Sequence, residues 1–147
     1  MRIALIVSRY NAFVTDRLEA GARAALRDAG LAESDIETFA VPGSYELAQA
    51  ASAVADTGRW NAIVCLGCLI RGETSHFEFI AQAAANGIIR AGQATGVPMT
   101  FGVLTTNSAE EALARAGEGS ANKGREAAIA AVGMARLYAR VSQTAGP

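Results

Sequence analysis

Short apolar runs alternate with longer amphipathic segments along the chain. The apolar runs, rich in Val, Ile, Leu and Ala, predict buried strands at residues 2–7, 36–41, 62–66 and 98–104. Between and after them, apolar residues recur every three or four positions, which predicts helices at residues 15–29, 44–57, 75–96, 108–117 and 121–141. The last two belong to one helical stretch that breaks around residues 117–119. We therefore expect a chain of repeated strand–helix units.

The predicted helix ends carry recognisable capping residues. Three of the helices are followed by a glycine that can adopt the left-handed stop conformation: Gly30, Gly58 and Gly96. Ser75 is followed three residues later by Glu78, and Ser108 by Glu111, which is the spacing of a capping box. These two serines are expected to begin their helices.

Strands joined by helices are expected to be parallel, with right-handed crossovers and helices on both faces of the sheet. The sequence therefore predicts one domain over residues 1–147, an α/β fold built as a three-layer α/β/α sandwich with a four-stranded parallel sheet. Sites in such sheets lie beyond the carboxyl ends of the strands. The unusual residues gather in the segments that follow the strands, which we expect to share one rim: 8–11, 41–46, 67–76 and 101–107.

Charge and hydropathy exclude several classes of partner. The chain has 13 Lys and Arg against 14 Asp and Glu, without a basic stripe, so neither nucleic acid nor an anionic membrane is expected as a partner. Its apolar stretches are shorter than the roughly 20 residues of a membrane span, and its start lacks a signal-peptide pattern, so we expect a cytoplasmic protein. Hydrophobic residues make up 51% of the chain and charged residues 18%, which favours a homo-oligomer that buries part of this surface.

Cys65 and Cys68 form a lone C-x-x-C, a spacing found in zinc half-sites and redox pairs. At the end of a strand, side chains three residues apart point to opposite faces and lie roughly 10 Å apart. A disulfide requires Cα atoms about 4.4 to 6.8 Å apart. Because the chain has only one histidine, no second Cys/His pair completes a metal site. We expect neither a disulfide nor a metal.

The only histidine, His76, lies in the first turn of a predicted helix. The positive end of a helix disfavours an imidazolium cation, so a neutral imidazole at this place suits a general base. Position alone also fits a histidine that simply packs at a helix start. Gly72, Glu73 and Thr74 precede the same helix, and their backbone N–H groups could bind an anion, although the same residues could form an ordinary glycine-rich turn. We expect the Glu73 carboxylate to turn outward or toward Arg71.

Basic and aromatic residues add further candidates for a binding site. Arg115 and Lys123 flank the break in the last helical stretch, where a guanidinium could bind phosphate or merely complement a helix dipole. Tyr10, Tyr45 and Phe101 lie on three separate loops or strand ends, where they could stack on a flat heterocycle. The polar contacts would then come from Asn11 and Glu46. Trp60, at the start of the third strand, is expected to pack at the opposite edge.

Together these segments resemble the lumazine synthase family over nearly the whole chain. The resemblance rests on several motifs in order: Ser-Arg-Tyr-Asn at 8–11, Val-Pro-Gly-Ser-Tyr-Glu-Leu at 41–47, Leu-Gly-Cys-Leu-Ile-Arg-Gly-Glu-Thr-Ser-His-Phe-Glu-Phe at 66–79, Phe-Gly-Val-Leu-Thr-Thr at 101–106 and Asn-Lys-Gly at 122–124. It implies a flavodoxin-like fold and the condensation of 5-amino-6-(D-ribitylamino)uracil with 3,4-dihydroxy-2-butanone 4-phosphate. No metal or redox cofactor is implied.

The resemblance also implies a role for each site residue. Tyr10, where the family usually has Phe, would stack on the pyrimidinedione, with Asn11 beside it. The ring and its ribityl chain would contact Ser44, Tyr45 and Glu46, a motif that more often reads Ala-Phe-Glu, and the backbone of Cys68, Leu69 and Ile70. Gly72, Glu73, Thr74 and Arg115 would bind the phosphate. His76 would transfer protons, and Phe101 and Lys123 would complete the pocket.

In the family, Phe101, Arg115 and Lys123 come from the neighbouring subunit of a pentamer, so the resemblance implies shared active sites. Association with riboflavin synthase is a further implied partner. The chain opens directly on its first predicted strand, without the arm that usually precedes it, which leaves pentamers, paired pentamers and icosahedral shells open. Two other functions stay open as alternatives: an archaeal-type riboflavin synthase, and a non-catalytic lumazine- or flavin-binding assembly protein.

Overall fold

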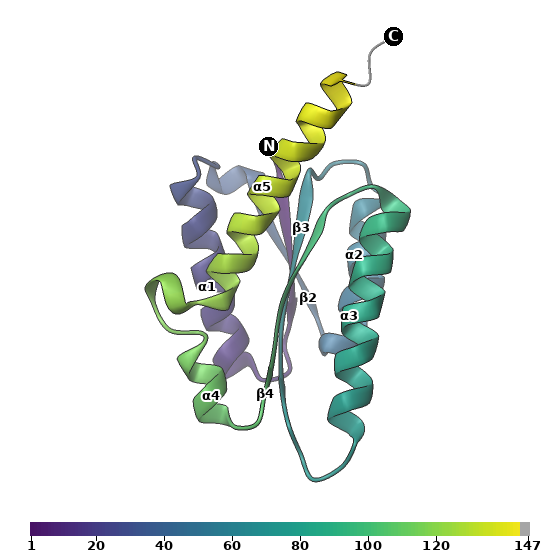
Figure 1. Ribbon diagram of the computed structural model, residues 1–147. Helices are drawn as coiled ribbons and strands as arrows, with labels where there is room; N and C mark the ends of the chain where they lie inside the picture. Colours follow the sequence, from purple (N-terminus) through teal and green to yellow (C-terminus); the bar gives the residue numbers. More distant parts are fainter. Residues whose placement is uncertain (145–147) are drawn as a thin grey trace.

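Four parallel strands form a single sheet in the order β2–β1–β3–β4. The computed structural model describes residues 1–144 (Figure 1). Its strands are β1 (Ile3–Ser8), β2 (Ile36–Val41), β3 (Ala62–Ile70) and β4 (Met99–Thr106). Its helices are α1 (Ala12–Asp28), α2 (Leu47–Ala55), α3 (His76–Thr95), α4 (Ala109–Ala114) and α5 (Lys123–Thr144), with 3₁₀ turns η1 (Glu33–Asp35), η2 (Ser44–Glu46) and η3 (Gly119–Ala121). The predicted domain also includes residues 145–147, which lie outside the described residues.

Helices cover both faces of the sheet. Figure 1 shows α1 and α5 on one side and α2 and α3 on the other. Every residue of β1 and all of β3 up to Leu69 are buried, as expected for central strands between two helical layers. The predicted three-layer α/β/α sandwich with a flavodoxin-like parallel sheet is confirmed.

Alternate residues of the central strands supply two separate hydrophobic cores. One core joins the sheet to α1 and α5, and the other joins it to α2 and α3. Cys68 belongs to the first core and Cys65 to the second, so the prediction that these cysteines face opposite sides of the sheet is confirmed. Both are buried and free, and burial raises the pKa of the Cys65 thiol to about 12 and that of Cys68 to about 11.

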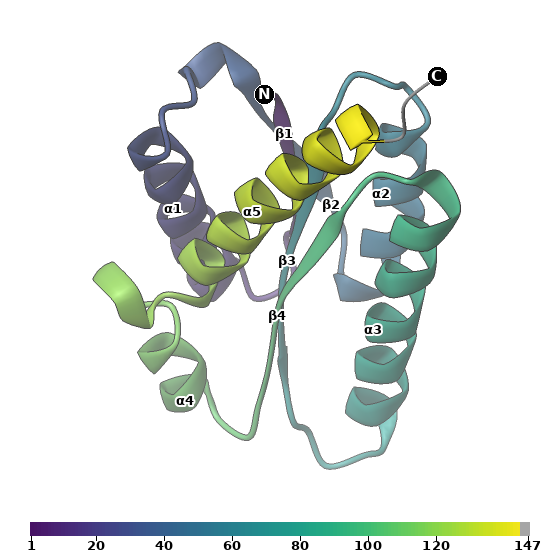
Figure 2. The same cartoon turned by 45° about the horizontal axis from the view of Figure 1, so that its top comes forward.

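Trp60 packs at the amino end of β3, as the sequence predicted. It is 5% exposed, and its ring meets that of Phe39 edge to face with centroids 6.1 Å apart. The Arg2 guanidinium lies 4.8 Å from the centre of the indole. The loops that follow β3 and β4 lie at the other end of the sheet (Figure 2).

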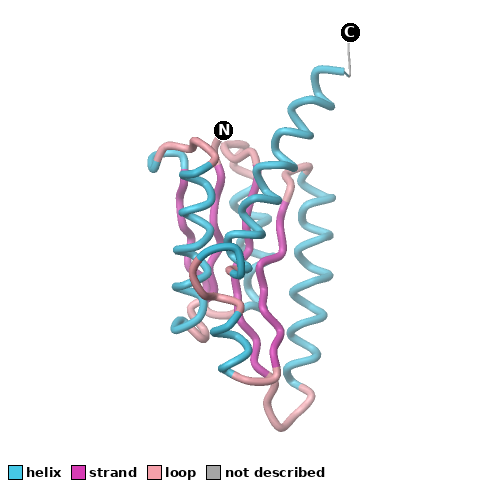
Figure 3. Tube along the Cα trace, turned by 60° about the vertical axis from the view of Figure 1, so that its left-hand side comes forward, coloured by secondary structure: helices cyan, strands magenta, loops and turns pink. Residues whose placement is uncertain are grey.

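The helices cross closely where the sequence supplies glycine. A Cβ atom at Gly124, in the first turn of α5, would lie 2.0 Å from the backbone oxygen of Leu18 in α1. Only a residue without a side chain lets these two helices approach so closely. Beyond this crossing, α5 continues past the amino ends of the strands (Figure 3). None of the helices within residues 1–144 is both long and apolar enough to cross a membrane.

Several element boundaries differ from prediction. β3 continues to Ile70, whereas residues 67–70 were expected in a loop, because β4 pairs with it as far as Thr106. α1 starts at Ala12 rather than near residue 15, since Asn11 takes the left-handed conformation that starts the helix. The helix predicted over 44–57 opens as the 3₁₀ turn η2 before α2 begins.

The two predicted capping boxes have different outcomes. At α4, the Ser108 hydroxyl accepts a hydrogen bond from the Glu111 amide at 3.2 Å, so the serine cap is confirmed. The Glu111 carboxylate reaches the Asn107 amide instead of that of Ser108. At α3, Ser75 takes the N-cap position but its side chain makes no capping bond, so the capping box is wrong there.

Candidate active site

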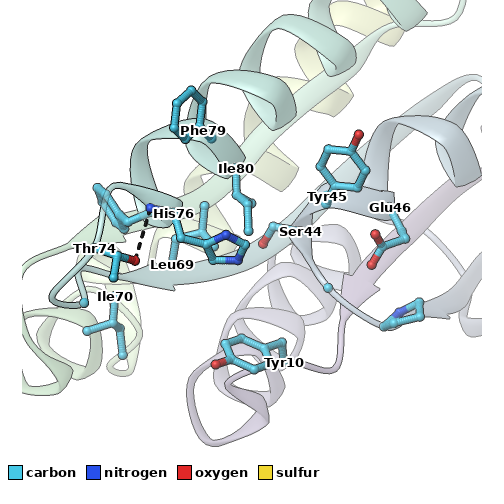
Figure 4. A pocket seen from close by; sticks show the side chains of 14 residues that line it. Tyr10, Ser44, Tyr45, Glu46, Leu69, Ile70, Thr74, His76, Phe79 and Ile80 are labelled. Carbon is cyan, nitrogen blue, oxygen red and sulfur yellow. Dashed lines mark hydrogen bonds between the residues drawn. The ribbon is translucent and has the colours of Figure 1, made fainter.

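A cavity of about 740 Å³ opens at the carboxyl end of the sheet, between the segments that follow β1, β2 and β3 and the first turns of α3. Figure 4 shows the labelled side chains converging on it. The cavity is lined by Tyr10, Pro42, Gly43, Ser44, Tyr45, Glu46, Leu69, Ile70, Gly72, Thr74, His76, Phe77, Phe79 and Ile80. The structure thus brings together most of the predicted site residues from three separate motifs.

Tyr10 occupies a turn that the neighbouring strands hold in place. Its backbone N–H donates to the Pro42 carbonyl at 3.1 Å, and the side-chain amide nitrogen of Asn11 donates to the Cys68 carbonyl at 2.9 Å. Asn11 has a φ of 60°, which ends the strand direction and starts α1. The Tyr10 side chain is 67% exposed at the cavity. An aromatic face is therefore presented on a braced turn.

Asn11 itself does not line the cavity, although the sequence placed it among the ligand contacts. Its amide N–H is used by the Cys68 carbonyl, as described above. This side chain braces the wall of the site, and its oxygen and its second N–H are left for contact with a ligand.

The 3₁₀ turn η2 packs directly on β3. Ser44 is 3% exposed, and its hydroxyl is shielded from solvent without a hydrogen-bond partner among the described residues. A Cβ atom at Gly67 would lie 2.5 Å from that hydroxyl, which would then have to turn aside, so glycine in β3 allows this approach without a rearrangement. Tyr45 follows on the open side, 66% exposed, and the half-buried Glu46 comes after it. η2 therefore contributes an aromatic ring and a carboxylate to the cavity.

The end of β3 offers free backbone groups. β3 pairs with β1 only as far as Leu66, but with β4 as far as Ile70. The Cys68 carbonyl points to the side where β1 has ended, where it meets Asn11. Because alternate residues of a strand direct their backbone groups to the same side, those of Ile70 face that side too. The Cys68 side chain is buried in the core, so only its backbone is available to a ligand.

His76 is the first residue of α3 and lines the cavity. Figure 4 shows its imidazole pointing into the cavity, on the side of Ser44. The His76 backbone N–H faces the Thr74 hydroxyl at 3.4 Å. The loop before it, residues 71–75, is exposed throughout, and Gly72 and Thr74 line the cavity while Glu73 does not. An imidazole, a hydroxyl and the loop amides therefore lie at the same opening of the cavity.

Arg71, at the start of this loop, pairs with residues of two neighbouring elements. Its guanidinium pairs with Glu78 in the first turn of α3 and donates to the Asn107 side chain at 3.0 Å. The Glu73 carboxylate does not pair with Arg71. Glu73 is exposed and does not line the cavity, which agrees with the first of the two expected alternatives, that its carboxylate turns outward. The pKa of Glu78 is lowered by the backbone amide at the helix start and by Arg71.

Phe101, Arg115 and Lys123 line a second cavity, of about 480 Å³. Phe101 lies in the amino-terminal half of β4, so its placement on the shared rim is wrong. β4 is an edge strand, and this cavity lies along its free side between β4 and α5. Arg115 donates to the Glu111 carbonyl at 3.0 Å, and the Lys123 ammonium lies 2.9 Å from the Glu126 carboxylate. One chain therefore carries two groups of candidate residues rather than one.

Sequence reasoning missed the apolar wall on α3. Phe77, Phe79 and Ile80 all line the first cavity, and Phe79 is 70% exposed. The available signal was that these apolar residues directly follow His76 in the first turns of the same predicted helix. Within residues 1–144, no group of three or more His, Cys, Asp or Glu side chains is arranged to hold a metal ion.

Comparison with known proteins gives a consistent family. A family model described as 6,7-dimethyl-8-ribityllumazine synthase matches residues 1–139. A protein of Deinococcus radiodurans named 6,7-dimethyl-8-ribityllumazine synthase is 44% identical over 143 residues, which cover 97% of this chain and 92% of the relative. A protein of the same name from Chlorobium phaeovibrioides is 47% identical over 137 residues, covering 93% of this chain and 88% of that relative.

Proposed function

This chain belongs to the 6,7-dimethyl-8-ribityllumazine synthase family, transferases of riboflavin biosynthesis, and from that premise we propose where and how it carries out the reaction. The reaction condenses 5-amino-6-(D-ribitylamino)uracil with 3,4-dihydroxy-2-butanone 4-phosphate and releases phosphate and water. The observation that carries the proposal is the first cavity, which combines an imidazole, two exposed tyrosine rings and an anion-compatible loop.

The pyrimidinedione binds beside Tyr10, whose exposed ring stacks on the flat heterocycle. Its polar edge is read by the backbone of Cys68 and Ile70, where β3 runs beyond β1, while Leu69, whose backbone is turned toward β4, lines the cavity. Strand N–H and C=O groups at fixed spacing suit a ring that presents alternating donors and acceptors. Asn11 supports this edge by holding the Cys68 carbonyl.

The ribityl chain extends toward η2, where Ser44, Tyr45 and Glu46 line the cavity. Hydroxyl groups of a sugar alcohol need several donors and acceptors, and a carboxylate accepts from more than one of them. The buried Ser44 hydroxyl, which has no partner among the described residues, gains one if a ribityl hydroxyl reaches it.

The phosphate of the ketone substrate binds at the loop before α3. Gly72, Glu73 and Thr74 supply backbone N–H groups, with the Thr74 hydroxyl beside them, at the positive end of a helix. The Glu73 side chain is exposed and not part of the cavity lining, so its carboxylate need not approach the dianion. The guanidinium of Arg115, from a neighbouring subunit, completes the phosphate site.

Assembly as a pentamer brings the two groups of residues together. Each chain contributes the His76 cavity to one active site, and its Phe101, Arg115 and Lys123 to the next one around the ring. The separation of these residues into two cavities on one chain supports this arrangement, and so do the large exposed apolar side chains Phe79, Ile89 and Ile129. We further propose that residues 1–147 act as one domain, that the protein is cytoplasmic, and that it associates with riboflavin synthase.

The reaction begins when the primary amine of the pyrimidine attacks the ketone carbonyl, which loses water to give an imine. Removal of the proton at C3 of the imine and elimination of phosphate from C4 give an enol, which tautomerises to a new carbonyl at C3. The ribitylamino nitrogen attacks this carbonyl and closes the ring with loss of a second water. Holding two reactants in place can lower such a barrier by about 7 to 11 kcal/mol. His76 moves protons between these steps and contributes on the order of 100-fold or more.

The direct test is a spectroscopic assay of the purified protein with both substrates. We expect the absorbance and fluorescence of the lumazine product to appear well above the uncatalysed rate measured without protein. Tight binding of the product without acceleration would instead indicate a carrier or storage protein, and would overturn the proposed activity.

A further inference from the structure

The Arg71 side chain connects three elements around the loop that precedes His76. Its Nε donates to the Asn107 side chain at 3.0 Å, just after β4, and its NH1 pairs with Glu78 in the first turn of α3. The guanidinium carbon lies 4.8 Å from the centre of the Phe77 ring. Its backbone N–H donates to the Thr106 carbonyl at 2.8 Å. We call Arg71, Glu78 and Asn107 the arginine bridge.

The loop inside this bridge has few attachments of its own. Residues 71–75 are exposed, and the Ser75 side chain makes no capping bond. The Ser75 carbonyl accepts from the backbone amides of Glu78 at 3.1 Å and Phe79 at 3.4 Å, and the His76 amide donates to the Thr74 hydroxyl at 3.4 Å. The arginine bridge therefore spans the loop, from the residue at its start to the first helical turn after it.

The charges within the bridge depend on one another. One Glu78 oxygen pairs with Arg71, while the other is shielded from solvent and has no hydrogen-bond partner among the described residues. Loss of the guanidinium would remove the ion pair that ties this side chain, which is 43% exposed, to the residue at the start of the loop. The first turn of α3 would then be free to rearrange, and His76 lies in that turn.

The bridge also reaches the second group of site residues. The backbone N–H of Asn107 donates to the Glu111 carboxylate at 3.0 Å. The Arg115 side chain donates to the Glu111 backbone carbonyl, also at 3.0 Å. Arg71 does not line the first cavity or the second one. Arg71 is therefore linked to both groups of candidate residues but lines neither cavity.

We propose that Arg71 is a positioning residue, which through Glu78 and Asn107 holds the phosphate-binding loop and the His76 imidazole in their working geometry. The inference rests on the proposed function. It distinguishes Arg71 from Arg115: the former acts through the protein, whereas the latter contacts the phosphate. Lysine cannot replace it, because an ammonium lacks the planar fork that reaches Asn107 and Glu78 together.

The kinetic test compares Arg71→Met with Arg27→Met in lumazine formation. Arg27 is a matched control, since it is 54% exposed against 50% for Arg71 and pairs with Glu33 far from the cavity. We expect Arg71→Met to lower kcat by about tenfold to a hundredfold, as for a small misplacement of reacting groups, with the KM for the pyrimidine changed by less than about twofold. Arg27→Met should match the wild type, and Arg71→Lys should not restore kcat.

A double variant separates positioning from direct binding. If the bridge is the mechanism, Arg71→Met and Glu78→Met are not additive, and the double variant is no slower than the slower single one. Direct contact with phosphate predicts otherwise: a raised KM for the phosphorylated substrate alone, additive with Glu78→Met and restored by Arg71→Lys. That pattern would overturn the proposal.

Hydrogen exchange tests the same inference without catalysis. We expect the hydrogen-bonded amides of Glu78 and Phe79, in the first turn of α3, to exchange at least about tenfold faster in Arg71→Met than in the wild type, while Arg27→Met leaves them unchanged. Equal exchange in all three proteins would refute the positioning role. This result stands even if the wild type forms no lumazine, an outcome that would refute the proposed activity by itself.

Discussion

His76 and Arg115 are the two side chains on which the proposed chemistry most depends, and they do different work. The imidazole points into the cavity from the first residue of α3, where it can take and return protons (Figure 4). Arg115 follows α4 and offers a fork of donors suited to a phosphate. Loss of the first should slow chemistry, whereas loss of the second should weaken binding of one substrate.

Steady-state kinetics of two alanine variants can separate these roles. We expect His76→Ala to lower kcat by on the order of 100-fold without abolishing turnover, because orientation of the substrates remains. Arg115→Ala should mainly raise the KM for the phosphorylated substrate, with a smaller effect on the KM for the pyrimidine. Unchanged rates in both variants would contradict the assignment.

Most individual site residues were predictable because their positions after strands were predictable. Tyr10, Ser44 and His76 each follow a strand that the apolar pattern located correctly, and parallel strands end at the same edge. Phe101 was misplaced because an aromatic residue inside a strand gives no signal of its distance from the strand end. The arginine bridge was not predicted, because more than one glutamate lies near Arg71 in the sequence and the pattern does not indicate which one pairs with it.

At the scale of elements, close backbone approach decides where the helices and η2 can lie. Gly67 admits η2 against β3, and Gly124 admits α5 against α1. Residues 67–70 were predicted as a loop, since Gly67 interrupts the apolar run. Pairing with β4 overrides that local signal and extends β3 to Ile70. Such tertiary pairing is invisible in the pattern of one strand.

Substitution of Gly124 tests the helix crossing. The added methyl group of Gly124→Ala would lie 2.0 Å from the Leu18 carbonyl oxygen, so α1 and α5 must move apart. We expect the free energy of unfolding to fall by about 1 to 3 kcal/mol, measured by thermal unfolding at a fixed chain concentration.

Gly133 provides the control on the same helix. A Cβ atom there meets nothing within 4 Å, so Gly133→Ala should stabilise the chain by roughly 0.5 to 1 kcal/mol through helix propensity. Equal effects of the two substitutions would show that the close crossing is not a constraint on the fold.

At the scale of the whole molecule, the candidate residues of the chain fall into two separate cavities, which the proposed function treats as two halves of a shared site. The cavity with His76 opens at the carboxyl end of the sheet, while Phe101, Arg115 and Lys123 line the free side of β4. Large apolar side chains remain exposed on both α3 and α5, among them Phe79, Ile89 and Val141. The apolar composition predicted self-association, but composition cannot indicate which faces meet.

Subunit mixing tests the central claim, that neighbouring chains complete each other's active site. His76→Ala and Arg115→Ala would be unfolded together, reassembled, and assayed for lumazine at a low concentration of the phosphorylated substrate, where each variant alone is slow. In mixed rings about a quarter of the interfaces should unite an intact His76 with an intact Arg115, so activity should rise well above that of either variant. Activity that only equals the average of the two variants would contradict a shared site.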